Sequence, residues 1–122
     1  MGRVVIRLDL SPKGRIGPGK IALLEQIGAN GSISAAGRAL GMSYRRAWIL
    51  VEELNRMFRQ PVVMAQPGGS GGGGATLTPL GSRLVDSYRA IEMEAQLQAA
   101  GRLAALEAAL ATVAVEPTPS RP

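Results

Sequence analysis

The side chains best suited to chemistry in this sequence lie together in the segment Ser-Tyr-Arg-Arg at positions 43–46. Hydroxyl and guanidinium groups bind anions, and arginine can also form paired hydrogen bonds with guanine. A serine in front of an apolar periodic segment is a typical helix N-cap, and the N-terminus of a helix favours an anion. These residue types therefore indicate recognition of phosphates or base edges. The alternative is an ordinary helical hairpin with two solvated arginines.

A second unusual segment is QPGGSGGGGATLTPLG, residues 66–81. It formally fits the G-x-G-x-x-G pattern of a dinucleotide-binding loop, but any glycine run does so. It lies between two short apolar segments rather than between a strand and a helix, and no lysine follows Lys20 to complete a Walker loop. We therefore interpret it as the tip of a β-hairpin. Because no lysine or arginine occurs between Arg59 and Arg83, a hairpin that meets DNA must use backbone N–H groups; a merely flexible hairpin is the alternative.

The composition leaves little basis for catalysis. The 122 residues contain no histidine and no cysteine, which excludes disulfides, thiolate–zinc sites and Ser-His or Cys-His nucleophile pairs. The close carboxylate pairs, Glu52 with Glu53 and Glu92 with Glu94, fall on helix faces that we expect to be exposed. We therefore predict that the chain is not an enzyme and that it holds no metal and no cofactor.

The net charge of +5 is unevenly distributed. Residues 1–60 contain ten Lys and Arg against four Asp and Glu, whereas residues 61–122 contain four against five. A basic half joined to a near-neutral half suggests a polyanion-binding end and an assembly end; a solvated basic surface is the alternative. The sequence has no signal-peptide pattern and no apolar run long enough for a membrane span. We therefore expect a soluble cytoplasmic protein with no membrane partner.

The elements at the start of the chain are a strand, a loop and a helix. Residues 3–10 alternate in polarity, which predicts a strand whose buried face carries Val4, Ile6, Leu8 and Leu10. Residues 11–19 are expected to form a loop. Three cations in and after it are candidates for contacts with a nucleic-acid backbone: Lys13, Arg15 and Lys20. Residues 19–31 show helical spacing, with Gly28 or Gly31 as the stop.

Residues 32–58 have the form of a helix-turn-helix. A serine at 32 or 34 caps a short helix, Gly41 is placed as the left-handed residue that ends it, and Ser43 caps a second helix. The apolar stripe of that helix comprises Ala47, Leu50, Val51, Leu54, Met57 and Phe58. Trp48 lies off this stripe, where it either packs against the first helix, which we favour, or stacks on a sugar–phosphate.

The last elements are a hairpin and a long helix. Pro61 ends the preceding helix, residues 62–66 and 75–77 are β-prone, and Thr78 followed by proline is a typical helix start. The long helix is expected to reach about residue 111, with a bend or break at Gly101. Its apolar side is expected to mediate dimerisation through Leu80, Leu84, Tyr88, Ile91 and Ala95.

These elements together predict a mostly helical α+β fold. We assign residues 1–78 to a winged helix-turn-helix domain with an N-terminal strand and residues 79–114 to a long dimerisation helix. The proline-rich, polar residues 115–122 are expected to form a disordered tail.

Three motifs carry a family resemblance. They are G-S-I-S-x-A before the turn, S-Y-x-x-A-W at the start of the second helix, and G-G-x-x-G-G-G-A-x-L-T-x-x-G across the hairpin into the long helix. Residues 3–95 thereby resemble the N-terminal winged helix-turn-helix domain of molybdate-responsive transcription regulators of the ModE type, which are distantly LysR-like. The resemblance implies a DNA-binding transcription regulator that dimerises through its long C-terminal helix together with the N-terminal strand region.

The expected DNA contacts combine this resemblance with the residue chemistry. They are Ser32, Ser34, Ser43, Tyr44, Arg45, Arg46 and Trp48, together with the hairpin glycines Gly71, Gly72 and Gly73. Full-length members of the family continue into paired small β-barrel domains that bind molybdate or tungstate. These 122 residues contain no counterpart of those domains, so no oxyanion ligand carries over, and we do not expect molybdate to bind this chain directly.

The function expected from the sequence is sequence-specific binding of double-stranded DNA by a homodimer, with a possible link to molybdenum metabolism. The helix over residues 43–58 would enter the major groove and the glycine-rich wing would meet the backbone. Two other classes remain open. One is a protein–protein adaptor that kept the fold without DNA binding, and the other is a small oxyanion-binding or enzymatic module.

Overall fold

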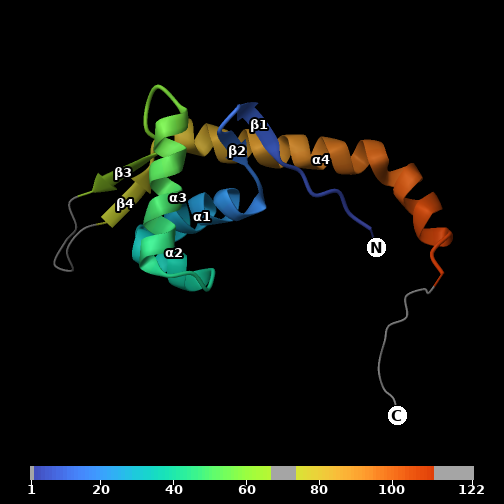
Figure 1. Ribbon diagram of the computed structural model, residues 1–122, viewed down its shortest axis with the longest axis horizontal. Helices are drawn as coiled ribbons and strands as arrows, with labels where there is room; N and C mark the ends of the chain where they lie inside the picture. Colours follow the sequence, from blue (N-terminus) through green and yellow to red (C-terminus); the bar gives the residue numbers. More distant parts are fainter. Residues whose placement is uncertain (1, 67–73, 112–122) are drawn as a thin grey trace, which may run out of the picture.

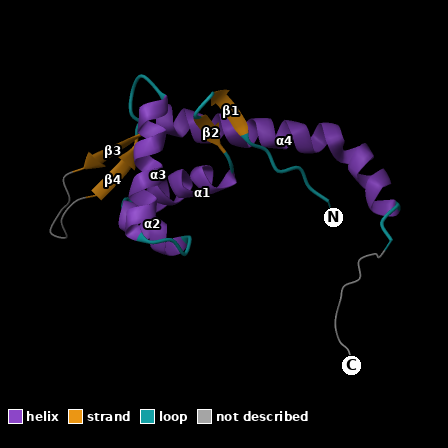
Figure 2. Ribbon diagram, viewed as in Figure 1, coloured by secondary structure: helices purple, strands orange, loops and turns teal. Residues whose placement is uncertain are grey.

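The computed structural model describes residues 2–66 and 74–111 and has an α+β fold in which helices predominate (Figure 1). Figure 2 shows the order of its elements along the chain. They are β1 (Leu8–Ser11), β2 (Gly14–Ile16), α1 (Pro18–Asn30), α2 (Ile33–Ala39), α3 (Tyr44–Met57), β3 (Val63–Gln66), β4 (Gly74–Leu77) and α4 (Pro79–Ala108). The fold is a winged helix with a long C-terminal helix, as the sequence predicts.

The N-terminal hairpin corrects the expected strand and loop. β1 starts only at Leu8, and β2 lies inside the segment that we expected to be a loop. The two strands pair antiparallel, with Asp9 opposite Arg15. Leu10 is 57% exposed rather than buried, because the register between the strands is irregular after Asp9.

The extended residues before β1 run along α4 instead of pairing with a strand. The backbone N–H of Val4 donates to Gln96 Oε1 at 2.7 Å, and the Tyr88 hydroxyl donates to the carbonyl oxygen of Ile6 at 2.8 Å. Val4 and Ile6 are half-buried there, whereas Val5 between them is exposed. The alternation of half-buried and exposed residues is therefore as predicted, but the segment lies against a helix rather than against another strand.

The helix-turn-helix forms through the caps that the sequence predicts. Ser32 accepts from the N–H of Ala35 at the start of α2, and Ser43 accepts from the N–H of Arg46 at the start of α3. Gly31 and Gly41 adopt left-handed φ values of 70° and 73°, which a glycine reaches without steric cost. α3 runs from Tyr44 to Met57 between its caps Ser43 and Phe58, which agrees with the helix expected over residues 43–58.

The wing consists of β3 and β4 in a regular antiparallel register, from Val63 opposite Leu77 to Gln66 opposite Gly74. The N–H of Ala75 donates to the carbonyl oxygen of Gly31 at 2.9 Å, which fixes β4 to the end of α1. The glycine-rich tip lies outside the described residues.

Wing and helices meet at Val62, which is fully buried. Its N–H donates to Asn55 Oδ1 of α3 at 2.8 Å, and its carbonyl oxygen accepts from the N–H of Thr78 at 3.0 Å. The Thr78 hydroxyl donates to the Pro61 carbonyl oxygen at 2.8 Å and accepts from the N–H of Gly81, which caps α4. α3, the wing and α4 are thereby joined at one point.

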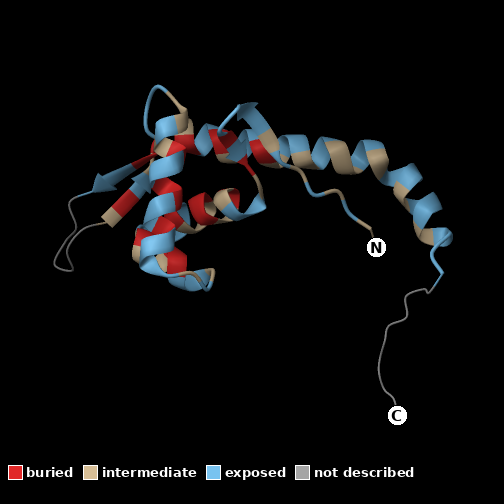
Figure 3. Cartoon of the chain, in the orientation of Figure 1, coloured by how far each residue is buried: buried red, intermediate tan, exposed pale blue. Residues whose placement is uncertain are grey.

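The long helix α4 has two parts that differ in burial (Figure 3). Near its start, Leu84 and Tyr88 belong to a core that is otherwise aliphatic and drawn mainly from α1, α2, α3 and the wing. Beyond Tyr88 the described helix has no buried residue and projects away from the domain. The helix is continuous through Gly101, so that residue does not break it. The expected tail, residues 115–122, lies outside the described residues.

Gly81→Ala will destabilise the fold, and Gly101→Ala in the same helix provides the matched control. A Cβ on Gly81 would clash with the backbone carbonyl of Val62, whereas a Cβ on Gly101 meets nothing within 4 Å. We expect the free energy of unfolding to fall by about 1–3 kcal/mol for the first variant. For the control it should stay level or rise by up to about 1 kcal/mol, because alanine is the better helix former. Urea unfolding followed by circular dichroism measures both, and equal values for the two variants would contradict the packing at Val62.

Candidate nucleic-acid interface

The second helix of the helix-turn-helix, α3, has one buried face and three exposed sides. Its buried face is the predicted stripe of Ala47, Leu50, Val51 and Leu54. At 100° per residue, the face directly opposite carries Arg45, Ile49, Glu52 and Arg56, all exposed. The flanks between these faces carry Arg46 on one side and the pair Tyr44 and Trp48 on the other. The exposed surface of α3 thus offers a partner a cationic N-terminal end, an apolar side chain at Ile49 and two flanks of different composition.

The predicted contact residues of α3 gather at its N-terminus and point outward. Ser43, Tyr44, Arg45 and Arg46 are all exposed there. Ser43 uses its hydroxyl oxygen as the helix cap, so only its O–H remains to donate to a ligand. Because α3 has no acidic residue in its first turn, neither the helix dipole nor the two arginines are neutralised locally.

Trp48, for which packing against the first helix was the favoured prediction, is 37% exposed and does not belong to the hydrophobic core. Its indole N–H donates to the Tyr44 hydroxyl, and the two rings meet edge to face with centroids 6.4 Å apart. The pair forms an exposed aromatic flank beside the N-terminus of α3.

The serines of α2 and the wing glycines are less informative. Ser32 and Ser34 are both half-buried. The Ser32 oxygen caps α2, and Ser34 accepts a hydrogen bond from Arg38 Nη1 at 3.0 Å. Gly71, Gly72 and Gly73 lie outside the described residues.

Two residues of this region were missed by sequence reasoning. Ile49 lies on the outer face of α3, 39% exposed and next to Arg45, where an apolar side chain suits contact with a thymine methyl group. Its position outside the apolar stripe was the available signal. Asn55 holds the wing because its side-chain oxygen accepts from the N–H groups of Val62 and Val63. Nothing in the sequence around Asn55 indicates this role.

The expected dimerisation residues divide between the core and the surface. Leu84 and Tyr88 are 8% and 0% exposed within this single chain, which corrects their assignment, because their side chains are already used to attach α4 to the domain. Leu80 and Ala95 are half-buried, and Ile91 is 40% exposed. Further large apolar side chains are exposed on the projecting part of α4, at Met93, Leu97 and Leu106, and just after its end, at Leu110.

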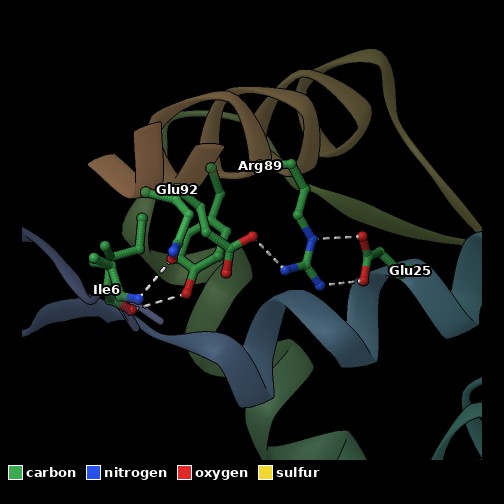
Figure 4. Close-up of polar contacts among 7 residues, drawn as sticks. Ile6, Glu25, Arg89 and Glu92 are labelled. Atoms are coloured by element: carbon green, nitrogen blue, oxygen red, sulfur yellow. Dashed lines mark hydrogen bonds and ion pairs between the residues drawn. The ribbon is translucent and has the colours of Figure 1, made fainter. Parts of the chain in front are cut away.

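Arg89 links α4 to α1 through an ion pair (Figure 4). Its guanidinium forms a bidentate pair with Glu25, at 2.9 Å from Nε and 2.7 Å from Nη2, and a third contact with Glu92 at 2.8 Å. Hydrogen bonding to Arg89 lowers the pKa of Glu25, outweighing the effect of burial, and both carboxylates raise the pKa of Arg89. Burial raises the pKa of the neighbouring Tyr88, so its hydroxyl remains a donor to Ile6.

The described residues offer no other evident chemistry. Among them, no three carboxylate side chains gather in an arrangement that could hold a metal ion. No helix in the described ranges is both long enough and apolar enough to cross a membrane. What the geometry defines is a winged helix-turn-helix with an exposed basic N-terminus on its second helix and a projecting C-terminal helix.

The sequence comparisons identify relatives of the same kind. The chain is 53% identical over 78 residues to the molybdenum-pterin-binding protein MopB of Rhodobacter capsulatus, covering 64% of this chain and 29% of the relative. It is 38% identical over 95 residues to the DNA-binding transcriptional dual regulator ModE of Escherichia coli, covering 78% and 35%. It is 42% identical over 77 residues to the molybdenum transport protein ModE of Azotobacter vinelandii, covering 63% and 28%. No protein-family model matches.

The chain is therefore a homologue of the N-terminal region of ModE-type, molybdate-related transcription regulators, as its motifs predict. It spans about a third of the length of the curated relatives that it matches.

The pair of Arg89 with Glu25 predicts a pH-dependent contribution to stability. Because the pKa of Glu25 is lowered in the folded state, the pair stabilises the fold above the unfolded pKa of about 4.3, and this stabilisation is lost as the pH falls through the folded value. The side chains are 41% and 37% exposed, so we expect Glu25→Gln to cost only about 0.5–1 kcal/mol at neutral pH, and progressively less as the pH falls through the folded pKa of Glu25.

Glu94→Gln is the control, since Glu94 is exposed and forms no ion pair within the described chain. Thermal unfolding of both variants across this pH range decides the matter. A loss for Glu25→Gln that persists at acid pH would show that the charge of Glu25 is not the cause.

Proposed function

We propose that this chain is a sequence-specific DNA-binding transcription regulator in which α3 enters the major groove. The observation that carries the proposal is the exposed, uncompensated cationic N-terminus of α3, with Ser43, Arg45 and Arg46 in its first turn. In helix-turn-helix proteins this is the end of the second helix that reaches base edges. The similarity to a regulator described as DNA-binding supports the same reading.

The three exposed sides of α3 suggest separate roles on a duplex. Arg45 lies on the outer face, where a guanidinium can bind guanine O6 and N7 bidentately, with Ile49 one turn further along. Arg46, Ser43 and Tyr44 lie towards the groove walls, where they can donate to phosphate oxygens. The hydrogen bond from Trp48 to the Tyr44 hydroxyl supports a role for Trp48 in orienting Tyr44 rather than in reading a base. The wing glycines Gly71, Gly72 and Gly73 remain proposed backbone contacts.

We also propose that the regulator acts as a homodimer through the projecting part of α4. Exposed Ile91, Met93 and Leu97 offer apolar surface that the domain itself leaves uncovered. A two-fold dimer would present two copies of α3 to successive major grooves about 34 Å apart. By analogy with its relatives, we place the regulator in molybdenum metabolism, with oxyanion sensing outside these 122 residues.

Arg45→Ala will reduce sequence discrimination, with Arg59→Ala as the control. Duplexes are first selected from a random library, with and without molybdate, and affinities for the selected and a scrambled duplex are then compared. Loss of a bidentate base contact should reduce the difference in binding free energy between the selected and the scrambled duplex by about 1–3 kcal/mol. Arg59 lies beyond the end of α3 and should affect both duplexes alike. Equal effects of the two variants would indicate charge attraction alone, and failure to select any duplex would favour a protein–protein adaptor.

Leu97→Glu will weaken dimerisation, with Gln98→Glu as the control. Leu97 is 72% exposed in the single chain, so a carboxylate there should not disturb the fold. In the proposed dimer the same position is buried, and burial of an unpaired carboxylate is costly. We expect sedimentation equilibrium at micromolar concentration to give a dimer for the parent and the control and a monomer for Leu97→Glu. A parent chain that sediments as a monomer would overturn the dimer proposal.

A further inference from the structure

The wing of this protein cannot supply the positive charge that a DNA-binding wing usually adds. No lysine or arginine occurs between Arg59 and Arg83, a stretch that contains the whole wing. Affinity for duplex DNA depends largely on neutralising phosphates with lysine and arginine. If α3 binds DNA, further phosphate contacts must come from cations elsewhere in the domain.

The other hairpin, β1–β2, carries such cations and lies beside α3. In Figure 1 the two hairpins lie on either side of α3. Two adjoining hollows separate α3 from β1–β2 and the start of α1, and Arg15 and Lys20 line both of them. Lys13 lines one hollow and Arg46 of α3 lines the other. We call this surface, defined by Lys13, Arg15, Lys20 and Arg46, the hairpin groove.

The groove keeps most of its charge unneutralised. Lys20 is paired with Glu53 at 3.4 Å, and Asp9, opposite Arg15 on the neighbouring strand, is held by Arg7 at 2.7 Å. Lys13, Arg15 and Arg46 themselves form no ion pair with any carboxylate of the described residues. Three free cations on a surface continuous with the N-terminus of α3 complement a polyanion.

The shape of the groove fits an extended backbone. α3 contributes positions 46, 50, 53, 56 and 57, which lie along one side of the helix. This side is roughly 16 Å long at 1.5 Å per residue. Successive phosphates of one DNA strand advance by about 3.4 Å along the helix axis, so the groove is long enough to follow several of them.

We infer that the hairpin groove holds the phosphate backbone of the same duplex that α3 enters, so that β1–β2 acts as a second, cationic wing. This inference rests on the proposed DNA binding and adds the residues that neutralise phosphates. Lys13 and Arg15 extend from the hairpin to the strand bordering the major groove, and Arg46 joins them to the N-terminus of α3. Lys20 orients the hairpin, since its ammonium donates to the carbonyl oxygen of Arg15 at 2.8 Å.

The test is the salt dependence of binding to a mixed-sequence duplex of about 30 base pairs, long enough for two half-sites. Fluorescence anisotropy compares the parent chain with the double variant Lys13→Gln/Arg15→Gln between about 50 and 200 mM salt. Loss of two phosphate contacts should reduce the steepness of log affinity against log salt by about 2 and lower the affinity on the order of a hundredfold at the lower salt. Both residues are exposed, and unchanged circular dichroism will show that the fold is intact.

Arg83→Gln/Arg102→Gln is the matched control, because it removes the same charge from exposed positions of α4 that do not line the groove. A reduced slope for the hairpin variant alone supports the inference. Equal slopes for the two variants, in a parent chain that does bind DNA, would overturn the inference and leave the proposed function standing. A parent chain without salt-sensitive duplex binding would overturn both.

Discussion

The structure depends on the backbone of one buried residue, Val62, where α3, the wing and α4 meet. Its N–H is held by Asn55 of α3, and its carbonyl oxygen by the N–H of Thr78. The start of α4 approaches so closely that only glycine fits at position 81. Buried backbone groups must be hydrogen-bonded, so the backbone at Val62 tolerates few rearrangements. The positions of the wing and of α4 relative to α3 are therefore both fixed by the contacts at Val62.

This junction explains why the first part of α4 is buried in the domain and the second part is exposed. Its first turns must lie against Val62, which places Leu84 and Tyr88 in the core. Within the described residues only the extended segment before β1 lies along the helix beyond them, and Arg89 bridges to Glu25 of α1 where the helix leaves the domain. A second chain bound to the projecting part would thus be held at a defined angle to α3. That coupling is what a dimeric reader of two half-sites requires.

Local signals in the sequence were sufficient for most of the fold. Ser32, Ser43 and Thr78 predicted helix starts and Gly41 a helix end, because caps are satisfied within a few residues. The errors concern partners distant in sequence. The alternation before Leu8 was read as a strand, although its partner is α4 some ninety residues away. Likewise, helical spacing put Leu84 and Tyr88 on one side of α4 but could not say whether a core or a second chain covers them.

The candidate site was predictable to the same degree, and for a related reason. The first turn of α3 is exposed because its residues fall outside a strongly periodic stripe, which the sequence displays directly. Nothing local, however, brings Lys13 and Arg15 towards Arg46; that proximity requires β2 to pair with β1 and the start of α1 to lie across a hollow from α3. Two hairpins then flank one helix with opposite properties. The glycine-rich wing offers backbone without charge, and β1–β2 offers charge. Phosphates that approach α3 therefore experience an asymmetric field, which favours one orientation of the domain on a duplex before any base is read.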